Sequence, residues 1–178
     1  MKKLIYSFLS VFFVLACNTI KDSTPNNEVN NKRFTKHVET FKNHFLKGFE
    51  TNDLDLMLEM YADSLSWNGP IEGGVEWNKS DISAVFSNYL ENFEDIELTK
   101  QLYFGGSVYS AQGEPSSDPD YVRVVGVWST KHKESGVLTS TKWHSVMWFN
   151  EDGKVYRGTD WMDVSGIENQ VKKGLEKQ

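Results

Sequence analysis

The chain has 178 residues, enough for one domain and short terminal segments, and carries a formal net charge of −6. An acidic surface repels phosphate groups, so the charge argues against nucleic acid and anionic lipid headgroups as partners. The single cysteine, Cys17, excludes a disulfide within the chain and leaves no thiol for catalysis or metal binding in the domain that follows.

The first 17 residues have the pattern of an export signal. The basic start Met1-Lys2-Lys3 precedes an apolar run over residues 4–16, which is shorter than the ~20 residues that a membrane-spanning helix needs. The run ends in Val14-Leu15-Ala16-Cys17, which resembles a lipobox, where bacterial lipoproteins are cleaved and their cysteine is lipidated. We therefore expect a lipoprotein signal peptide over residues 1–17 and a protein anchored by lipidated Cys17 to a membrane of the bacterial cell envelope. An ordinary signal peptide that happens to contain a cysteine is the alternative.

A flexible tether and three helices are predicted next. Residues 18–33 are polar and cannot bury enough apolar surface to offset the cost of ordering, so they are predicted to be the tether. From residue 34, apolar side chains recur at spacings of three and four, which predicts a helix with an inner face of Phe34, Val38, Phe41, Phe45 and Phe49. Asp53 is placed to cap a short second helix, and Ser80 a third.

After the third helix the apolar period changes to two. The alternation predicts strands at Ile96–Phe104, Tyr121–Lys133, Val137–Phe149 and Lys154–Asp163, with an earlier short strand at Ser64–Asn68. Helices followed by a run of antiparallel strands indicate an α+β domain, which we place at residues 34–165. Residues 166–178 are expected to form a short helix or a tail.

Turn residues predict which side chains share a face of the sheet. If Glu151 and Asp152 form a two-residue loop, Asp160 lies directly opposite Trp143, and directly opposed residues share a face. The face predicted to point inward contains Val122, Val124, Trp128, Thr130, His132, Thr141, Trp143, Ser145, Met147, Phe149, Tyr156, Asp160 and Met162. The face predicted to point outward contains Arg123, Val125, Val127, His144, Val146, Trp148, Arg157 and Trp161.

Two motifs resemble those of nuclear transport factor 2-like proteins, also called SnoaL-like. The stretch Asn52–Asp63, followed by Trp67 and Pro70, is similar to their "gDlda" turn and the "yaDd" before their first strand. The end of the domain, from Phe149 through Asp152-Gly153-Lys154-Val155 to Trp161-Met162-Asp163, resembles their last hairpin. The resemblance implies a cone of three helices on a strongly curved, mostly antiparallel sheet, with a pocket at the wide end. It also implies dimers through the outer face of the sheet.

This fold carries both enzymes and proteins without catalytic activity, so the family does not decide the function. Ketosteroid isomerases share it, but the positions of their catalytic residues are taken here by Gly69, Phe45 and Ser145, which argues against that activity. Some polyketide cyclases of this fold use an acid–base aspartate on the last strand, and Asp160 lies near that position.

Asp160 is the first candidate for a functional residue, because a carboxylate among aromatic side chains tends to have a raised pKa and suits a general acid or base. A hydrogen-bonded carboxylate without a catalytic role is the alternative. His132 is a weaker candidate for its partner, since it lies near a strand end and a solvated side chain explains it as well. The predicted ligand-binding residues are Trp67, Trp128, Thr141, Trp143, Ser145 and Tyr156. No pattern of metal ligands or cofactor motif is found in the sequence, so neither is expected.

Three functions remain open. The preferred one is a lipid-anchored pocket domain that binds a small, largely apolar molecule. The second is a cofactor-independent lyase, isomerase or cyclase that uses Asp160 as acid–base. The third is a dimeric interaction protein without a ligand. A homodimer is expected in each case, because the outward face gathers tryptophan and valine side chains.

The lipobox makes a direct prediction. Cys17→Ser removes the thioether-forming sulfur, so the variant is expected to leave the membrane fraction or to accumulate as an uncleaved precursor. Fractionation of cells, with mass spectrometry of the mature N-terminus, measures both. A wild-type protein that is fully soluble and carries no acyl chain would contradict the prediction.

Overall fold

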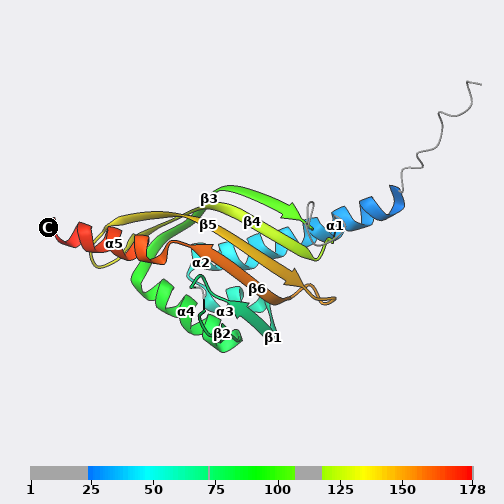
Figure 1. The fold of residues 1–178 in the computed structure, drawn as a ribbon, viewed down its shortest axis with the longest axis horizontal. Coiled ribbons are helices and arrows are strands. Elements are labelled where there is room, and N and C mark those ends of the chain that lie inside the picture. The colour runs from blue at the N-terminus through cyan, green and yellow to red at the C-terminus, as the bar shows by residue number, and fades with distance from the viewer. Residues whose placement is uncertain (1–23, 72, 107–117, 178) are drawn as a thin grey trace, which may run out of the picture.

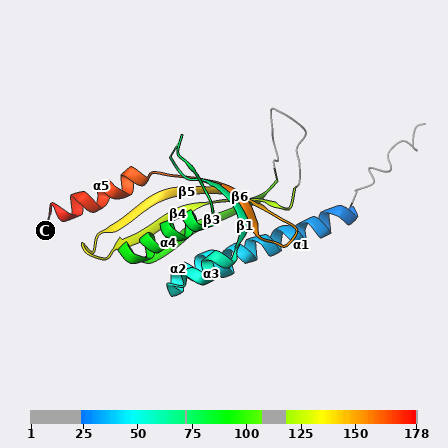
Figure 2. The same cartoon turned by 90° about the horizontal axis from the view of Figure 1, so that it is seen from below.

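The computed structural model describes residues 24–71, 73–106 and 118–177. Four helical segments at the N-terminal end and helix α4 lie on one side of a curved sheet, as Figures 1 and 2 show from two directions. The architecture is therefore α+β, as the sequence predicts. The predicted signal peptide and its cysteine lie outside the described residues. In the part of the chain that is described, no helix is both long and apolar enough to span a membrane.

The first predicted helix is one continuous helical rod of three parts, α1 (Thr24–Thr40), η1 (Phe41–Leu46) and α2 (Lys47–Thr51). The wider turn of the π-helical part η1 keeps Phe41, Phe45 and Phe49 on one face, although their spacing of four exceeds the 3.6-residue repeat of an α-helix. The rod ends at Asn52, whose φ of 57° is left-handed. Asp53 then caps α3 (Leu54–Glu59) by accepting a hydrogen bond from the Leu56 amide, as predicted.

Two helix boundaries differ from the prediction. The tether is predicted to reach residue 33, but α1 begins at Thr24. The helix therefore also contains the polar residues that precede its amphipathic part. Figures 1 and 2 show this end of α1 projecting beyond the sheet. The third helix, α4 (Lys79–Asn92), is capped by Asn78 rather than Ser80, because Asn78 and Asp81 form a reciprocal capping box.

The sheet contains six strands in the order β2-β1-β6-β5-β4-β3. These are β1 (Tyr61–Asn68), β2 (Glu76–Trp77), β3 (Phe93–Gly105), β4 (Tyr121–His132), β5 (Leu138–Phe149) and β6 (Val155–Met162). All neighbours are antiparallel except β1 and β6, which are parallel. The two-residue strand β2 was not predicted, since it is too short to show an alternating pattern.

The register between β4 and β5 agrees with the prediction, with Trp128 opposite Thr141 and Thr130 opposite Thr139. The register between β5 and β6 is shifted by two residues, so that Asp160 lies opposite Ser145 and Trp143 lies opposite Met162. One residue of the shift comes from a longer turn, because Phe149 pairs with Val155 rather than Lys154. The other comes from a bulge beside Trp148. A register shift of two residues leaves every side chain on its original face of the sheet. Asp160 therefore keeps its predicted inward face despite its different partner.

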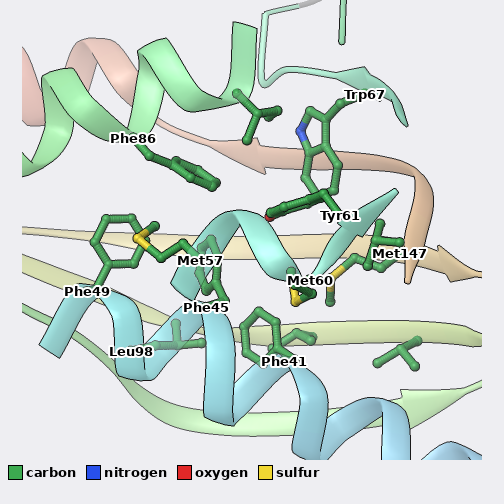
Figure 3. Close-up of a cluster of buried hydrophobic side chains, with 14 of the residues drawn as sticks. Phe41, Phe45, Phe49, Met57, Met60, Tyr61, Trp67, Phe86, Leu98 and Met147 are labelled. Atoms are coloured by element: carbon green, nitrogen blue, oxygen red, sulfur yellow. The ribbon is translucent and has the colours of Figure 1, made fainter. Parts of the chain in front are cut away.

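Aromatic and sulfur-containing side chains from helices and strands form the core (Figure 3). The ring centroids of Phe45 and Trp143 lie 5.9 Å apart in parallel planes, and Phe49 meets Trp128 edge-on at 5.1 Å. Such contacts add to the burial of apolar area and hold the helical rod on the concave face of the sheet.

The C-terminal segment forms helix α5 (Val164–Leu175), which docks where β6 ends. Asp163 caps it, and Ile167 is its buried apolar residue. Beyond the end of β6, the edge of β5 is unpaired, and the side-chain amide of Gln170 binds both backbone groups of Ser140 there, at 2.9 and 3.1 Å. The C-terminal segment, predicted to be a short helix or a tail, therefore contains a helix through Leu175 that covers an exposed strand edge.

Candidate functional site

A cavity of about 480 Å³ lies between the sheet and the helices. Its wall is mostly apolar, with nearly half of its residues aromatic, and is contributed by the helical rod, by α4 and by strands β1, β2, β4, β5 and β6. Ile71 and the exposed residues Ala84 and Asn88 of α4 belong to the same wall, which places the mouth beside α4. The volume falls in the range of sites for small molecules.

Asp160 of β6 is the one acidic residue of this wall, which contains no lysine, arginine or histidine among the described residues. Burial raises the pKa of its carboxyl to about 6, because an ionised carboxylate loses hydration there. The indole N–H groups of Trp143 and Trp67 oppose this shift by a smaller amount, since they favour the ionised form.

The polar atoms around Asp160 are not fully paired. Among the described residues, neither Oδ1 of Asp160 nor Nε1 of Trp67 has a hydrogen-bond partner, and both atoms are buried. The Trp67 indole therefore lies close enough to act on the carboxyl but outside the geometry of a hydrogen bond. A buried polar atom without a partner carries a desolvation cost that a bound molecule can relieve.

Gly158 of β6 fixes the place of the Trp67 ring. Trp67 lies directly beside Gly158 across the parallel pair of β1 and β6. A Cβ atom at Gly158 would stand 2.0 Å from the six-membered part of the indole, so a side chain here would displace the ring. The absent side chain thus lets Trp67 lie flat against β6, two residues from Asp160.

The other predicted tryptophans also line the cavity. Trp143 is buried and stacks on both Phe41 and Phe45. Trp128 donates its indole N–H to the Tyr89 hydroxyl at 3.1 Å, which leaves its rings as an apolar wall. Ser145 is fully buried opposite Asp160 and donates its hydroxyl to the Thr159 carbonyl at 3.3 Å.

Three predicted site residues lie elsewhere. Tyr156 is 40% exposed, because it is the extra residue between Val155 and Arg157 where the register shifts. Thr141 is half-buried opposite Trp128, but it does not belong to the cavity wall. His132 lies eight residues along β4 from the level of Asp160, or about 25 Å, and binds Ser135 in the turn that follows. It cannot act as the partner of Asp160.

The structure adds residues that the sequence did not assign to the site. Tyr61, predicted as a helical core residue, is the first residue of β1 and stands close enough to Asp160 for its charge to raise the pKa of the phenol further. Figure 3 shows Tyr61 beside Trp67, with Phe86 of α4 facing them. Trp77 of β2 lies against Gly69 and completes the wall. Apolar side chains at alternating positions, such as Tyr61, Leu65 and Trp67, form the pattern from which a longer first strand could have been predicted. The sequence of β2 shows no such pattern.

Solved structures with the same architecture are numerous. The chain has the nuclear transport factor 2-like fold. A putative polyketide cyclase from Xanthomonas campestris pv. campestris matches with a TM-score of 0.60 and 14% identity over 80% of this chain and 98% of that one. A steroid delta-isomerase from Pseudomonas aeruginosa matches with a TM-score of 0.52 and 16% identity over 80% and 90% of the two chains.

An LEH-like epoxide hydrolase from M. tuberculosis matches with a TM-score of 0.55 and 12% identity over 80% of this chain and 93% of that one. At such identities the likeness concerns the fold. The sequence matches no model of a known protein family, and a search of curated proteins finds no relative.

The raised pKa of Asp160 predicts how its replacement changes stability with pH. The folded state holds the proton more tightly than the unfolded state, so this stabilisation is complete below about pH 4 and is lost as the pH rises through about 6. Two pKa units correspond to about 3 kcal/mol. Asp160→Asn is therefore expected to leave the free energy of unfolding nearly unchanged at pH 4 and to raise it by up to about 3 kcal/mol at pH 7.

Urea unfolding of the wild type and of Asp160→Asn between pH 4 and 7 measures the difference between their free energies of unfolding. The contributions of the other titrating groups are common to both proteins and cancel in this difference. Asp152→Asn is the matched control, because it removes a carboxyl in the exposed turn after β5, outside the cavity. A variant that is less stable than the wild type at pH 7 would show that the carboxylate is a structural acceptor.

Proposed function

We propose that the domain binds a small, largely apolar molecule in the cavity while lipidated Cys17 anchors it to a membrane. The observation that carries this proposal is the open aromatic cavity itself. Packed interiors rarely leave such a space, and a cavity of about 480 Å³ exposes apolar wall that a ligand of the same character would cover.

The unpaired polar atoms support recognition of one particular ligand. Oδ1 of Asp160 and the N–H of Trp67 offer an acceptor and a donor on neighbouring strands. The remaining wall provides shape and apolar contact. A few polar groups in an apolar pocket orient a ligand, because any molecule that leaves them unpaired binds less tightly.

Catalysis by Asp160 is the second candidate. A carboxyl with a pKa of about 6 is ready to exchange a proton near neutral pH, and the neutral hydroxyl of Tyr61 lies close enough for Asp160 to affect its pKa. These two groups are the acid–base pair that a cofactor-independent lyase, isomerase or cyclase would need. The third candidate, a dimer with a filled cone, is disfavoured by the cavity.

Occupancy of the cavity is tested by native mass spectrometry of the protein purified from its own host. We expect an added mass on the wild type, and its loss in Ala84→Trp, because a tryptophan at the mouth of the cavity fills the space by which a ligand enters. Ser83→Trp is the matched control, since Ser83 lies on the same helix but outside the cavity wall.

The absence of an added mass on the wild type, beyond that of the processed chain, would contradict a bound ligand, and the same added mass on all three proteins would contradict binding in the cavity. Incubation of fresh protein with the recovered molecule separates the first two candidates, since an enzyme converts it and a binding protein returns it unchanged.

Self-association through the outer face of the sheet is also proposed. Leu102, Phe104 and Trp161 are 58%, 42% and 51% exposed there, and Trp161 stacks on His144 with ring centroids 5.0 Å apart. Val125 and Val127 line a groove beside them. Val146 contributes less than the sequence predicts, because it is only 3% exposed. Such apolar surface is typical of a partner interface.

Trp161→Glu is expected to convert a homodimer into monomers, since it places a charge in an apolar interface. Light scattering at tens of micromolar protein gives the mass of each form. Leu138→Glu, which changes an even more exposed apolar residue at the far end of β5, should remain dimeric. A monomeric wild type at this concentration would refute the proposal.

A further inference from the structure

The cavity has an unbalanced charge. Its wall contains the carboxyl of Asp160 and no basic side chain among the described residues. The other titratable groups of the wall are the phenols of Tyr61 and Tyr89, whose pKa values are both raised by burial, so they stay neutral. The described residues of the wall therefore supply no positive group to compensate the ionised carboxylate.

Two neighbouring groups favour the ionised carboxylate, although burial has the larger and opposite effect on its pKa. The N–H groups of Trp143 and Trp67 both act on the carboxyl in the direction that keeps the negative charge. Asp160 nevertheless keeps one oxygen, Oδ1, without a partner. A buried charge without a counter-ion is unfavourable, and the most direct remedy is a positive group on the molecule that enters the cavity.

The walls of the cavity suit such a group. The faces of tryptophan and tyrosine rings attract organic cations, most strongly where water is excluded, and tryptophan is the best of the aromatic side chains for this purpose. Tyr61 and Trp67 of β1 and Trp143 of β5 lie around the carboxyl, on the two strands that flank β6. Phe86 and Trp77 extend the aromatic wall toward the mouth.

We propose that the ligand of this cavity carries an organic ammonium group, which pairs with Asp160 and lies against the rings of Trp67, Trp143 and Tyr61. The inference rests on the proposed binding function and names its ligand class. The rest of the ligand is apolar, because the wall beyond Asp160 offers little else to bind.

Two probes of the same shape separate charge from shape. Choline contains a trimethylammonium group, and 3,3-dimethyl-1-butanol is its neutral counterpart with carbon in place of nitrogen. Titration of the full chain, followed by tryptophan fluorescence and ligand-observed NMR, gives both dissociation constants. At pH 8 we expect choline to bind at least about tenfold more tightly, which is about 1.4 kcal/mol.

Asp160→Asn should reduce this preference to within about twofold, whereas the control Asp152→Asn should keep it. Should Asp160→Asn fail to fold, the pH profile of the wild type gives the same information. Choline has a fixed charge, so its affinity should fall as the pH drops through about 6, where Asp160 takes up a proton. The affinity of the neutral alcohol should not.

Equal binding of the two probes at pH 8, or a preference that survives Asp160→Asn, overturns the ammonium inference and leaves the binding function intact. Binding of neither probe at millimolar concentration overturns it as well. The native mass spectra of the wild type and Ala84→Trp then decide independently whether the cavity holds a molecule at all.

Discussion

The packing of one aromatic stripe against a curved sheet sets the shape of this domain. Phe41, Phe45 and Phe49 lie at a spacing of four along the helical rod and meet Trp128 and Trp143 on the concave face. This contact holds the helices in place. The same five side chains line the cavity, whose other walls come from α4, β1, β2 and β6. The cavity is therefore the space that these large side chains leave unfilled between the helical rod, α4 and the sheet.

The chemistry of the cavity follows from what surrounds one carboxyl. Asp160 is held between tryptophans, is not matched by a basic residue of the wall, and keeps an oxygen unpaired. This arrangement lowers the stability of the folded protein near neutral pH, since the carboxyl resists ionisation. Groups that cost stability and still stand in a cavity are typical of functional sites, where binding recovers the loss. Gly158 belongs to the same arrangement, because its missing side chain makes room for Trp67.

Irregular backbone positions decide which side chains reach the cavity. The shift of two residues between β5 and β6 brings Asp160 opposite Ser145 and moves Tyr156 into solvent. Had the shift been of one residue, Asp160 would have pointed outward and Trp161 inward. The turn at Gly153, with a φ of 74°, and the bulge beside Trp148 thus contribute as much to the site as the residues that line it.

Hydrophobic periodicity and capping are local properties, so the α+β class, the helical stripe, the cap at Asp53, the four long strands and the inward face of Asp160 could be predicted from the chain alone. Three tryptophans of the wall, Trp67, Trp128 and Trp143, could be predicted as well. The folded structure was needed to show that Tyr61 and Trp77 stand in the wall, that His132 and Thr141 do not, and that Tyr156 is exposed. These outcomes depend on bulges, on strand order and on contacts between segments far apart in the chain. The free energies that decide these positions arise from packing between such segments, so they cannot be inferred from any short stretch of sequence.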